Sequence, residues 1–325
     1  MPLLVATESE VLVLDEERSA LRPVPGLEDR PTCLAADRRR PGPVWCGTRR
    51  AGLFRLDAGD ASWRATGLSD LHVTAVAADP LEPEAVWVGT EPSQLWRSRD
   101  GGNTWERSPS LEALPSSSEW SFPPRPETHH VRWIAPHPHL PGRLWVAIEA
   151  GALVFTADSG RTWRDRVPGG PYDTHELAIH PDRPETLRAA AGDGYFESAD
   201  GGLTWDRPLE GLDVGYLRSV AIDPGDPDIV LVSAATHAHA AYVAGRSDGR
   251  VYRREGNGPW ERITDGWPDP PNTIAPLLRP GAAPGEFWAA DERGIHRSGD
   301  GGRSWRRVAA FPTPPNHLRG LVLTG

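Results

Sequence analysis

The sequence lacks lysine altogether, and all 35 basic residues of the 325-residue chain are arginines. Chemistry that depends on a lysine amine, such as Schiff-base catalysis, is therefore excluded. The net charge is −10 and no basic run stands out, which argues against a nucleic-acid-binding surface. The N-terminal apolar stretch has no basic flank and is interrupted by polar residues 7–10, so neither a signal peptide nor a membrane span is expected. We expect a cytoplasmic protein with no nucleic-acid or membrane partner.

Cysteine and helix-forming patterns are also scarce. The only two cysteines, Cys33 and Cys46, fall on what should be neighbouring strands. Buried free thiols are the simpler interpretation of this pair, and a disulfide is the alternative. The chain has 34 glycines, 34 prolines and many alternating apolar runs, and no amphipathic stretch reaches helical length. These patterns favour a protein built from strands and turns.

A short motif recurs four times along the chain. The four copies read SRDGGNTW at 98–105, TADSGRTW at 156–163, SADGGLTW at 198–205 and SGDGGRSW at 298–305. An aspartate that accepts backbone N–H bonds, a glycine that can adopt positive φ and a following β-former predict a tight turn between antiparallel strands. We therefore assign a structural role to the four motif aspartates, Asp100, Asp158, Asp200 and Asp300.

The motif has the form Ser/Thr-x-Asp-x-Gly-x-Thr/Ser-Trp, so the chain resembles the Asp-box, or BNR-repeat, β-propeller superfamily. That superfamily includes sialidases, xyloglucan-cleaving endoglucanases, sortilin-type receptors and the photosystem II stability factor. The resemblance implies a propeller in which each box lies on the turn between the third and fourth strands, away from the catalytic face. Sialidases have six blades and a Phe/Tyr-Arg-Ile/Leu-Pro motif that is missing here, so sialidase activity is not expected.

The spacing of the box tryptophans predicts the number of blades. With two degenerate boxes that end at Trp63 and Trp260, the successive steps are 42, 58, 42, 55 and 45 residues. This spacing is typical of propeller blades, with two insertions. Each unit begins with an apolar strand that ends in x-Pro and continues with three more strands. The six units occupy residues 31–70, 72–111, 131–169, 174–212, 217–266 and 273–311.

The two ends of the chain supply a seventh unit. Residues 317–325 resemble a first strand, and residues 1–25 resemble the second, third and fourth strands of the same blade. Pairing them closes the ring and removes the exposed sheet edges of an open array. The sequence thus predicts one all-β domain, a seven-bladed propeller of four-stranded antiparallel blades closed by the C-terminal strand.

Strand order also predicts which segments share a face. We define the top face as the end of the ring that carries the linkers before the first strands and the turns between second and third strands. Insertions at 112–130 and 236–249 should both emerge there, and neutral loop drift is the alternative explanation for them. Seven of the 11 histidines fall on top-face segments, which is typical of a ligand-binding mouth. A solvated polar surface is the alternative.

The candidate site residues lie on these top-face segments. Guanidinium groups suit carboxylates and phosphates, and three arginines occupy matching first-strand positions on blades three, five and seven. The predicted ligand-binding set is Arg132, Arg218, Arg319, Glu91, Asp193 and His237. The predicted acid–base set is His72, His130, His175, Tyr216 and Glu149. A further hypothesis places one divalent transition metal on four imidazoles, His72, His130, His175 and His317.

These observations favour an enzyme of the hydrolase or lyase type, with or without a metal. Its expected ligand is a small polar or anionic molecule, a class that includes carbohydrates. The alternative is a non-catalytic scaffold or assembly factor that binds a protein partner on the same face.

Overall fold

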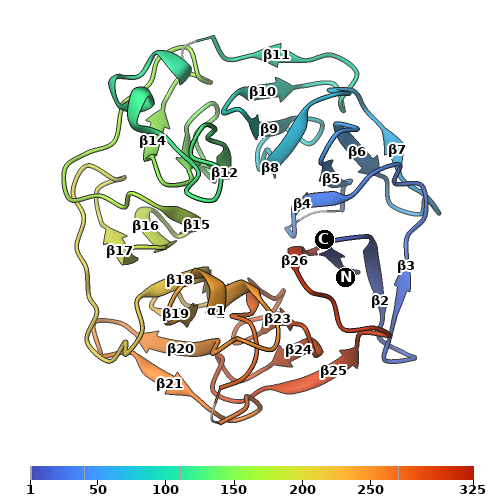
Figure 1. Cartoon of the computed structure of the whole chain (residues 1–325), viewed down its shortest axis with the longest axis vertical. Helices are drawn as coiled ribbons and strands as arrows, with labels where there is room; N and C mark the ends of the chain where they lie inside the picture. Colours follow the sequence, from blue (N-terminus) through green and yellow to red (C-terminus); the bar gives the residue numbers. More distant parts are fainter. Residues whose placement is uncertain (1, 40, 110, 270) are drawn as a thin grey trace.

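The computed structural model describes residues 2–39, 41–109, 111–269 and 271–325. Seven small antiparallel sheets stand in a ring around a central axis (Figure 1), which confirms the predicted seven-bladed propeller. Residues 1, 40, 110 and 270, which fall within or beside the expected blades, lie outside the described ranges. In the part of the chain that is described, no helix is long and apolar enough to cross a membrane.

Each blade starts with a strand beside the axis and adds strands outward. From blade one to blade seven, the innermost strands are β4 (Pro31–Ala35), β8 (His72–Ala78), β12 (Val131–Pro136), β15 (Thr174–His180), β18 (Tyr216–Ile222), β22 (Leu277–Pro280) and β26 (Leu318–Leu323). The second strands are β5 (Val44–Thr48), β9 (Val86–Glu91), β13 (Leu144–Ile148), β16 (Arg183–Ala191), β19 (Ile229–Ala235), β23 (Phe287–Asp291) and β1 (Leu3–Thr7). The third strands are β6 (Leu53–Leu56), β10 (Leu95–Ser98), β14 (Ala152–Thr156), β17 (Gly194–Ser198), β20 (Arg250–Glu255), β24 (Gly294–Ser298) and β2 (Val11–Asp15).

The outermost strands are short, and two blades have only a remnant of one. The named outer strands are β7 (Arg64–Ala65), β11 (Glu106–Arg107), β21 (Glu261–Ile263), β25 (Arg306–Ala310) and β3 (Ala20–Pro23). In blades three and four the outer segment makes one isolated bridge to the third strand, Phe155 to Arg164 and Glu197 to Asp206. In blade four the ladder stops near Pro208, which has no N–H group to donate.

The C-terminal strand closes the ring as predicted. Strand β26 pairs antiparallel with β1, with Leu3 opposite Leu323 and Ala6 opposite Gly320. The Thr324 amide also donates to the Pro2 carbonyl at 3.1 Å, which ties the two chain ends together. Because β1, β2 and β3 continue the same sheet outward, the first and last parts of the sequence form one blade.

The two cysteines are free. Cys33 lies on β4 and Cys46 is buried on the adjacent strand β5. Burial raises the pKa of the Cys33 thiol to about 12 and raises that of Cys46 well above its usual value. Both thiols therefore stay protonated near neutral pH, so they act as small apolar groups and not as nucleophiles.

The Asp-box turns have the hydrogen bonds expected from their sequence. In the first box, Asp100 Oδ1 accepts from the Thr104 amide at 2.9 Å, and Oδ2 accepts from the Thr104 hydroxyl at 2.7 Å. The Gly101 amide donates to the Glu84 carbonyl in the turn between the first and second strands. The Trp105 indole reaches back to the Thr66 carbonyl of the preceding blade at 3.0 Å. The boxes therefore tie turns and blades together at the face opposite the top face.

These turns predict a loss of stability in acid. Hydrogen bonds from Thr204 lower the pKa of Asp200 to about 2, below its usual 3.8. A carboxylate with a depressed folded-state pKa contributes stability above its unfolded pKa and loses it as the pH falls through the folded value. We expect Asp200→Asn to lower the melting temperature at pH 7 and to reduce the fall between pH 4 and 2, as followed by circular dichroism. The same substitution at exposed Asp60 should alter neither, and an Asp200→Asn profile parallel to wild type would contradict this role.

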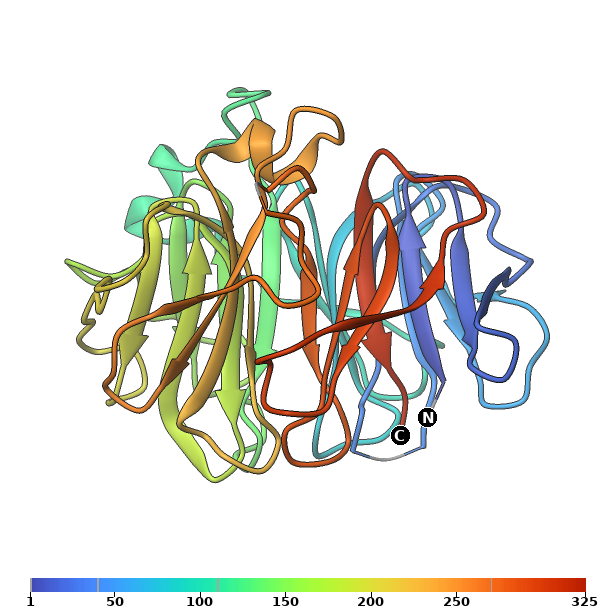
Figure 2. The same cartoon turned by 90° about the horizontal axis from the view of Figure 1, so that it is seen from below.

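Both insertions project from one end of the ring. The segment near 112–130 forms two 3-10 turns, η1 (Leu111–Ala113) and η2 (Pro115–Glu119), and the other insertion carries helix α1 (Ala238–Tyr242). Figure 2 shows α1 and the η turns at the same end, opposite the labelled chain termini. Trp120, which follows η2, is buried in the core cluster of blades two and three and donates to Ser116 Oγ at 3.0 Å. The insertions thus extend the top face above blades three and five.

Candidate functional site

Six of the seven innermost strands carry a β-bulge near the top face. In β12, Val131 pairs with Ile148 and Trp133 pairs with Ala147, so Arg132 is the extra residue between them. A bulge redirects its side chain, and such bulges are common next to functional sites. The six extra residues, here called the bulge ring, are Thr32, Thr74, Arg132, His175, Arg218 and Arg319. All six line one narrow cavity on the axis.

Four members of the bulge ring fasten one blade to the next. Each donates a side-chain hydrogen bond to a backbone carbonyl of the following blade. The pairs are Thr32 Oγ1 to Val73 at 2.5 Å, Thr74 Oγ1 to Val131 at 2.7 Å, His175 Nδ1 to Leu217 at 2.5 Å and Arg218 Nη1 to Ala275 at 2.7 Å. The primary use of this ring position is therefore structural.

Arg218 corrects one of the sequence-based assignments. Its side chain is buried, and its second terminal nitrogen donates to the Leu318 carbonyl at 2.9 Å. Its guanidinium also lies 4.6 Å from the ring centre of Tyr242. Burial, followed by repulsion from Arg132 and Arg319, lowers the pKa of Arg218 to about 10. Arg218 is thus a blade-joining residue that adds positive charge beneath the site, and its terminal nitrogens are not free to bind a ligand.

Arg132 and Arg319 are the two exceptions in the bulge ring. Arg132 Nη2 donates to the Tyr242 hydroxyl at 3.1 Å, and its Nε lies 3.2 Å from Glu149 Oε2. Arg319 is exposed to solvent. Within the described ranges, no carboxylate or carbonyl group pairs with the Arg319 guanidinium. Although Arg319 is exposed by surface area, partial desolvation at the channel wall and repulsion from Arg132 lower its pKa, and the Glu8 carboxylate offsets part of this effect.

Glu149 holds an ionised carboxylate at the mouth. It begins the turn after β13, and its Oε2 lies 3.0 Å from His130 Nε2 in addition to its contact with Arg132. Burial alone would raise its pKa, but the attraction of Arg132 and the hydrogen bond from His130 lower it to about 2. Glu149 is therefore a fixed negative charge and not a carboxylic acid at neutral pH.

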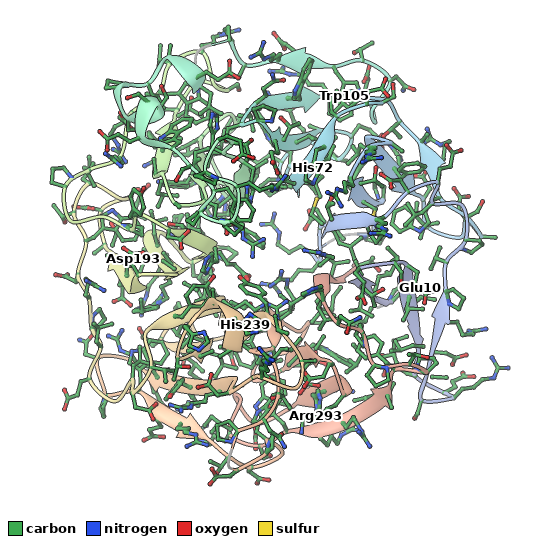
Figure 3. The ribbon with its side chains drawn as sticks, viewed as in Figure 1. Glu10, His72, Trp105, Asp193, His239 and Arg293 are labelled. Atoms are coloured by element: carbon green, nitrogen blue, oxygen red, sulfur yellow. The ribbon has the colours of Figure 1, made fainter. Side chains whose placement is uncertain are left out.

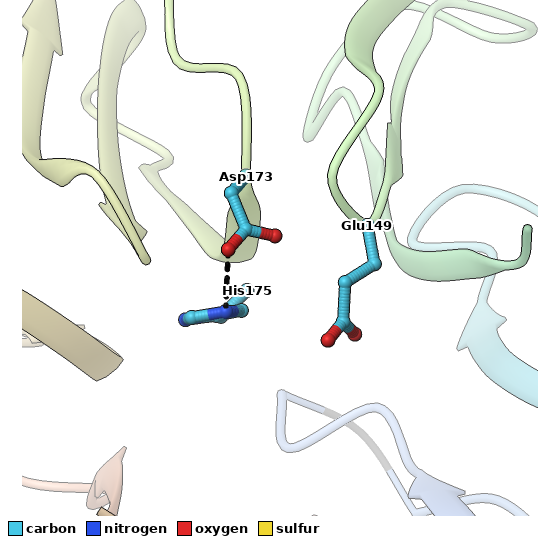
Figure 4. A group of neighbouring side chains, drawn as sticks. All are labelled: Glu149, Asp173 and His175. Atoms are coloured by element: carbon cyan, nitrogen blue, oxygen red, sulfur yellow. Dashed lines mark ion pairs between the residues drawn. The ribbon is translucent and has the colours of Figure 1, made fainter. Parts of the chain in front are cut away.

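His175 is a buried imidazolium held by three groups. Its Nδ1 donates to the Leu217 carbonyl, while Nε2 lies 3.2 Å from the Tyr216 hydroxyl and 3.5 Å from Asp173 Oδ2 (Figure 4). Burial opposes the charge, but Tyr242, Asp173 and nearby Glu149 raise the His175 pKa to about 9. Both ring nitrogens therefore carry protons at neutral pH.

Tyr242 is the residue that sequence reasoning missed. It is the last residue of α1. Its hydroxyl accepts a hydrogen bond from Arg132, and the Arg218 guanidinium lies over its ring. Burial raises its pKa, but His175, Arg132 and Arg218 outweigh burial and lower it. The opposite holds for Tyr216, whose pKa is raised by burial and by neighbouring negative charge. The one feature of the sequence that could have indicated Tyr242 is its position inside the top-face insertion at 236–249.

The predicted four-histidine metal centre does not form. Among the described residues, one group of three candidate ligands comes together, Glu149, Asp173 and His175, with ligand atoms within 4.8 Å of one another. His175 sits deeper than the other imidazoles because it occupies the bulge. The carboxylate of Glu149 is already paired with Arg132 and His130, and that of Asp173 faces His175. The three residues thus belong to an ion-pair network. A metal cation would have to compete with the cationic side chains that already pair with these carboxylates.

The remaining predicted residues have local partners. His72, which lies near the axis in Figure 3, is 3.3 Å from Glu91, and Glu91 also pairs with Arg125 at 2.7 Å. Asp193 accepts from the Asp173 amide at 3.3 Å, which positions the loop that carries Asp173. His237 Nδ1 caps α1 by accepting from the Ala240 amide, and the His317 amide donates to Glu8. These five predicted residues, His72, Glu91, Asp193, His237 and His317, have separate partners and are not gathered around one point.

A second cavity lies at the other end of the channel. Its walls are mostly apolar side chains of the innermost strands, such as Val76, Ile179 and Val322. The buried ion pair between Arg279 and Glu176, 2.6 Å apart, lines both cavities and so lies between them. The predicted acid–base residues are at the top face, whereas the titratable residues of the second cavity, apart from arginines, are Asp37, Glu176 and His180.

Comparisons with known proteins agree on the fold. No family model matches the chain. A probable oligoxyloglucan-reducing end-specific xyloglucanase of Neosartorya fischeri is 28% identical over 167 residues, which cover 47% of this chain and 19% of that protein. The GH74 enzyme of Niastella koreensis superposes with a TM-score of 0.74 at 15% identity, covering 95% of this chain and 52% of that one. YCF48 bound to a D1 peptide superposes with a TM-score of 0.58 at 18% identity, covering 87% of both chains.

The chain covers different shares of the lengths of these relatives. It spans about one fifth of the curated xyloglucanase and about half of the GH74 chain. At these identities the structural likeness shows a shared β-propeller fold and no more. The function therefore has to be argued from the site.

Proposed function

We propose that the top mouth of the channel binds a small anionic ligand, with a sugar acid as the best-suited class. The observation that carries this proposal is that the residues of the bulge ring differ in their hydrogen bonding. Four of its residues make blade-to-blade hydrogen bonds, whereas Arg319 lines the same cavity without such a bond. A guanidinium fork is suited to a carboxylate or phosphate.

The charge balance of the mouth supports an anion. Arg132, Arg218, Arg319 and the His175 imidazolium supply four positive charges, against the carboxylates of Glu149 and Asp173 and that of Glu8, which attracts Arg319. Glu91 is already paired with His72 and Arg125, so four cations face three carboxylates here, on a chain whose net charge is −10. A focused positive mouth on a negative protein concentrates anions at that point. The similarity to a probable oligoxyloglucan-reducing end-specific xyloglucanase supports a carbohydrate as the body of the ligand.

Binding should depend on Arg319. We expect galacturonate and inorganic phosphate to bind in isothermal titration calorimetry, and neutral galactose to bind more weakly. Losing a charged hydrogen bond costs about 1.5–3 kcal/mol, so Arg319→Ala should weaken binding on the order of 10- to 100-fold. The matched control is Arg306→Ala, an exposed arginine on the outer strand β25. Equal affinities in wild type and Arg319→Ala, or no binding of either anion, would refute the proposal.

A protein partner is the second candidate, because YCF48 matches this chain over 87% of both lengths and is bound to a peptide. A partner that presents a carboxylate would use the same arginines. In that case the native protein should co-purify with a stoichiometric partner, and Arg319→Ala should release it while free sugar acids fail to compete.

A further inference from the structure

Two neighbouring tyrosines at the top face pack edge to face in opposite electrostatic surroundings. The ring centres of Tyr216 and Tyr242 lie 6.1 Å apart at 83°. The Tyr242 oxygen accepts a hydrogen bond from the Arg132 guanidinium, and Arg218 lies over its ring. Cations on two sides stabilise a phenolate, so Tyr242 is suited to receive a proton.

The surroundings of Tyr216 have the opposite effect. Its oxygen is 3.2 Å from His175 Nε2, and the carboxylate of Asp173 lies 3.5 Å from the same nitrogen. Burial, Tyr242 and the nearby carboxylates raise the pKa of Tyr216 and disfavour a phenolate here, while Tyr242, Asp173 and Glu149 raise the pKa of His175 and keep it protonated. Tyr216 is thus a hydroxyl that can give up its proton to a substrate oxygen and be resupplied by His175. Where the surroundings shift the pKa values of two neighbouring groups in opposite directions, one group can be assigned as the acid and the other as the base.

The carboxylates at the mouth do not suit glycoside hydrolysis. That reaction ordinarily needs two carboxyl groups, one of which must be protonated to act as the acid. Glu149 is instead held ionised by Arg132 and His130, and Asp173 faces the His175 imidazolium. The arrangement suits removal of a proton from the carbon next to a carboxylate that Arg319 binds.

We infer that the site catalyses β-elimination on a uronate-containing saccharide, with Tyr242 as the base and Tyr216 as the acid. This inference rests on the proposed anion binding at Arg319. The C5–H bond breaks and its proton passes to the Tyr242 oxygen, while the released electron pair forms the C4=C5 double bond. The C4–O bond breaks with its electron pair on the leaving oxygen, which takes the Tyr216 proton. His175 then reprotonates Tyr216, and solvent restores His175 and removes the proton from Tyr242.

Arg319 and Arg132 have distinct parts in this step. Arg319 neutralises the substrate carboxylate, which makes the adjacent C5 proton more acidic and stabilises the charge that develops on the carboxylate oxygens. Arg132 and Arg218 stabilise the phenolate before the transfer. No oxidant, reductant or metal is needed for the atoms and electrons to balance.

The test uses the full chain with polygalacturonate and alginate as probes. Elimination creates a double bond conjugated with the carboxylate, so ultraviolet absorbance and new reducing ends should rise together. Tyr242→Phe keeps the ring beside Arg218 and should lower kcat on the order of 10²- to 10⁴-fold, with galacturonate affinity unchanged. Tyr172→Phe, at an exposed tyrosine outside the site, is the matched control and should keep wild-type turnover.

A second measurement separates the acid from the base. In D2O, exchange of the galacturonate C5 hydrogen, followed by nuclear magnetic resonance, needs only the base. Tyr216→Phe should therefore slow chain cleavage but retain this exchange, whereas Tyr242→Phe should lose both. Three results would overturn the inference and leave anion binding intact. The first is new reducing ends without the ultraviolet absorbance of the double bond, and the second is wild-type turnover in Tyr242→Phe. The third is a protein that binds galacturonate but neither cleaves the polymers nor exchanges the C5 hydrogen. Absence of galacturonate binding would overturn the proposed function itself.

Discussion

Removal of residues 317–325 is expected to abolish the cooperative unfolding transition of this protein. The deletion takes away β26, the innermost strand of blade seven, and leaves β1 with an unpaired edge. It also removes Leu318, Leu321 and Leu323 from the core cluster shared by blades six and seven. Burial of one leucine contributes about 1.5–3 kcal/mol, and a whole domain is stable by only about 5–15 kcal/mol. These three side chains alone therefore account for a large share of the net stability.

Differential scanning calorimetry and size-exclusion chromatography would measure the effect. The truncated chain should show no sharp transition and should associate through the exposed edge of β1. A synthetic peptide of residues 316–325 added in trans should restore the transition, because it supplies the missing strand. Removal of the exposed Gly325 alone should leave it unchanged. A truncated monomer that melts at the wild-type temperature would show that the ring does not need this closure.

His175 should make the folded state less stable as the pH rises from about 6.5 to about 9. Its pKa is raised from 6.5 to about 9 by Tyr242, Asp173 and Glu149, against the effect of burial. A group with a raised folded-state pKa contributes its full stability below the unfolded pKa and loses it as the pH rises through the folded value. The shift corresponds to stability on the order of 3 kcal/mol.

The corresponding experiment is a melting curve at each pH between 6 and 10. Wild type should lose several degrees across the window, since one kcal/mol corresponds to about 2–4 °C for domains of 150–250 residues. His175→Asn retains a donor for the Leu217 carbonyl but cannot become a cation, so its profile should be flat there. His239→Asn, at an exposed histidine of α1, is the control and should follow wild type. An equal fall in His175→Asn would assign the titration to another group.

The sequence predicted where the site lies better than it predicted which side chains contact one another there. Aligning the first strands on their x-Pro ends brought Arg132, Arg218 and Arg319 to equivalent positions, and the structure places all three on bulges that face the axis. The alignment could not tell that Arg218 is consumed by the carbonyls of Ala275 and Leu318 while Arg319 is not. That difference depends on the distance to the next blade, which no local pattern encodes.

The acid–base groups depended even more on long-range contacts. Tyr242 meets Arg132 across 110 residues of sequence, and it does so because α1 folds over the channel mouth. Its lowered pKa comes from charges supplied by three blades. The histidines, which looked alike in the sequence, separate into different roles once each has its own partner, such as Glu91 for His72 and Glu149 for His130.

The sequence by itself determined the architecture of this protein, because the information is local and repeated. Each Asp-box specifies its own turn through hydrogen bonds between residues at most a few positions apart, the spacing of six tryptophans sets six blades, and the strand patterns at the two chain ends supply the seventh. The tertiary structure alone decided which ionisable groups are charged and which are free. Those properties follow from burial and from neighbours on other blades, and Arg319 differs from Arg218 only in what the ring places beside it.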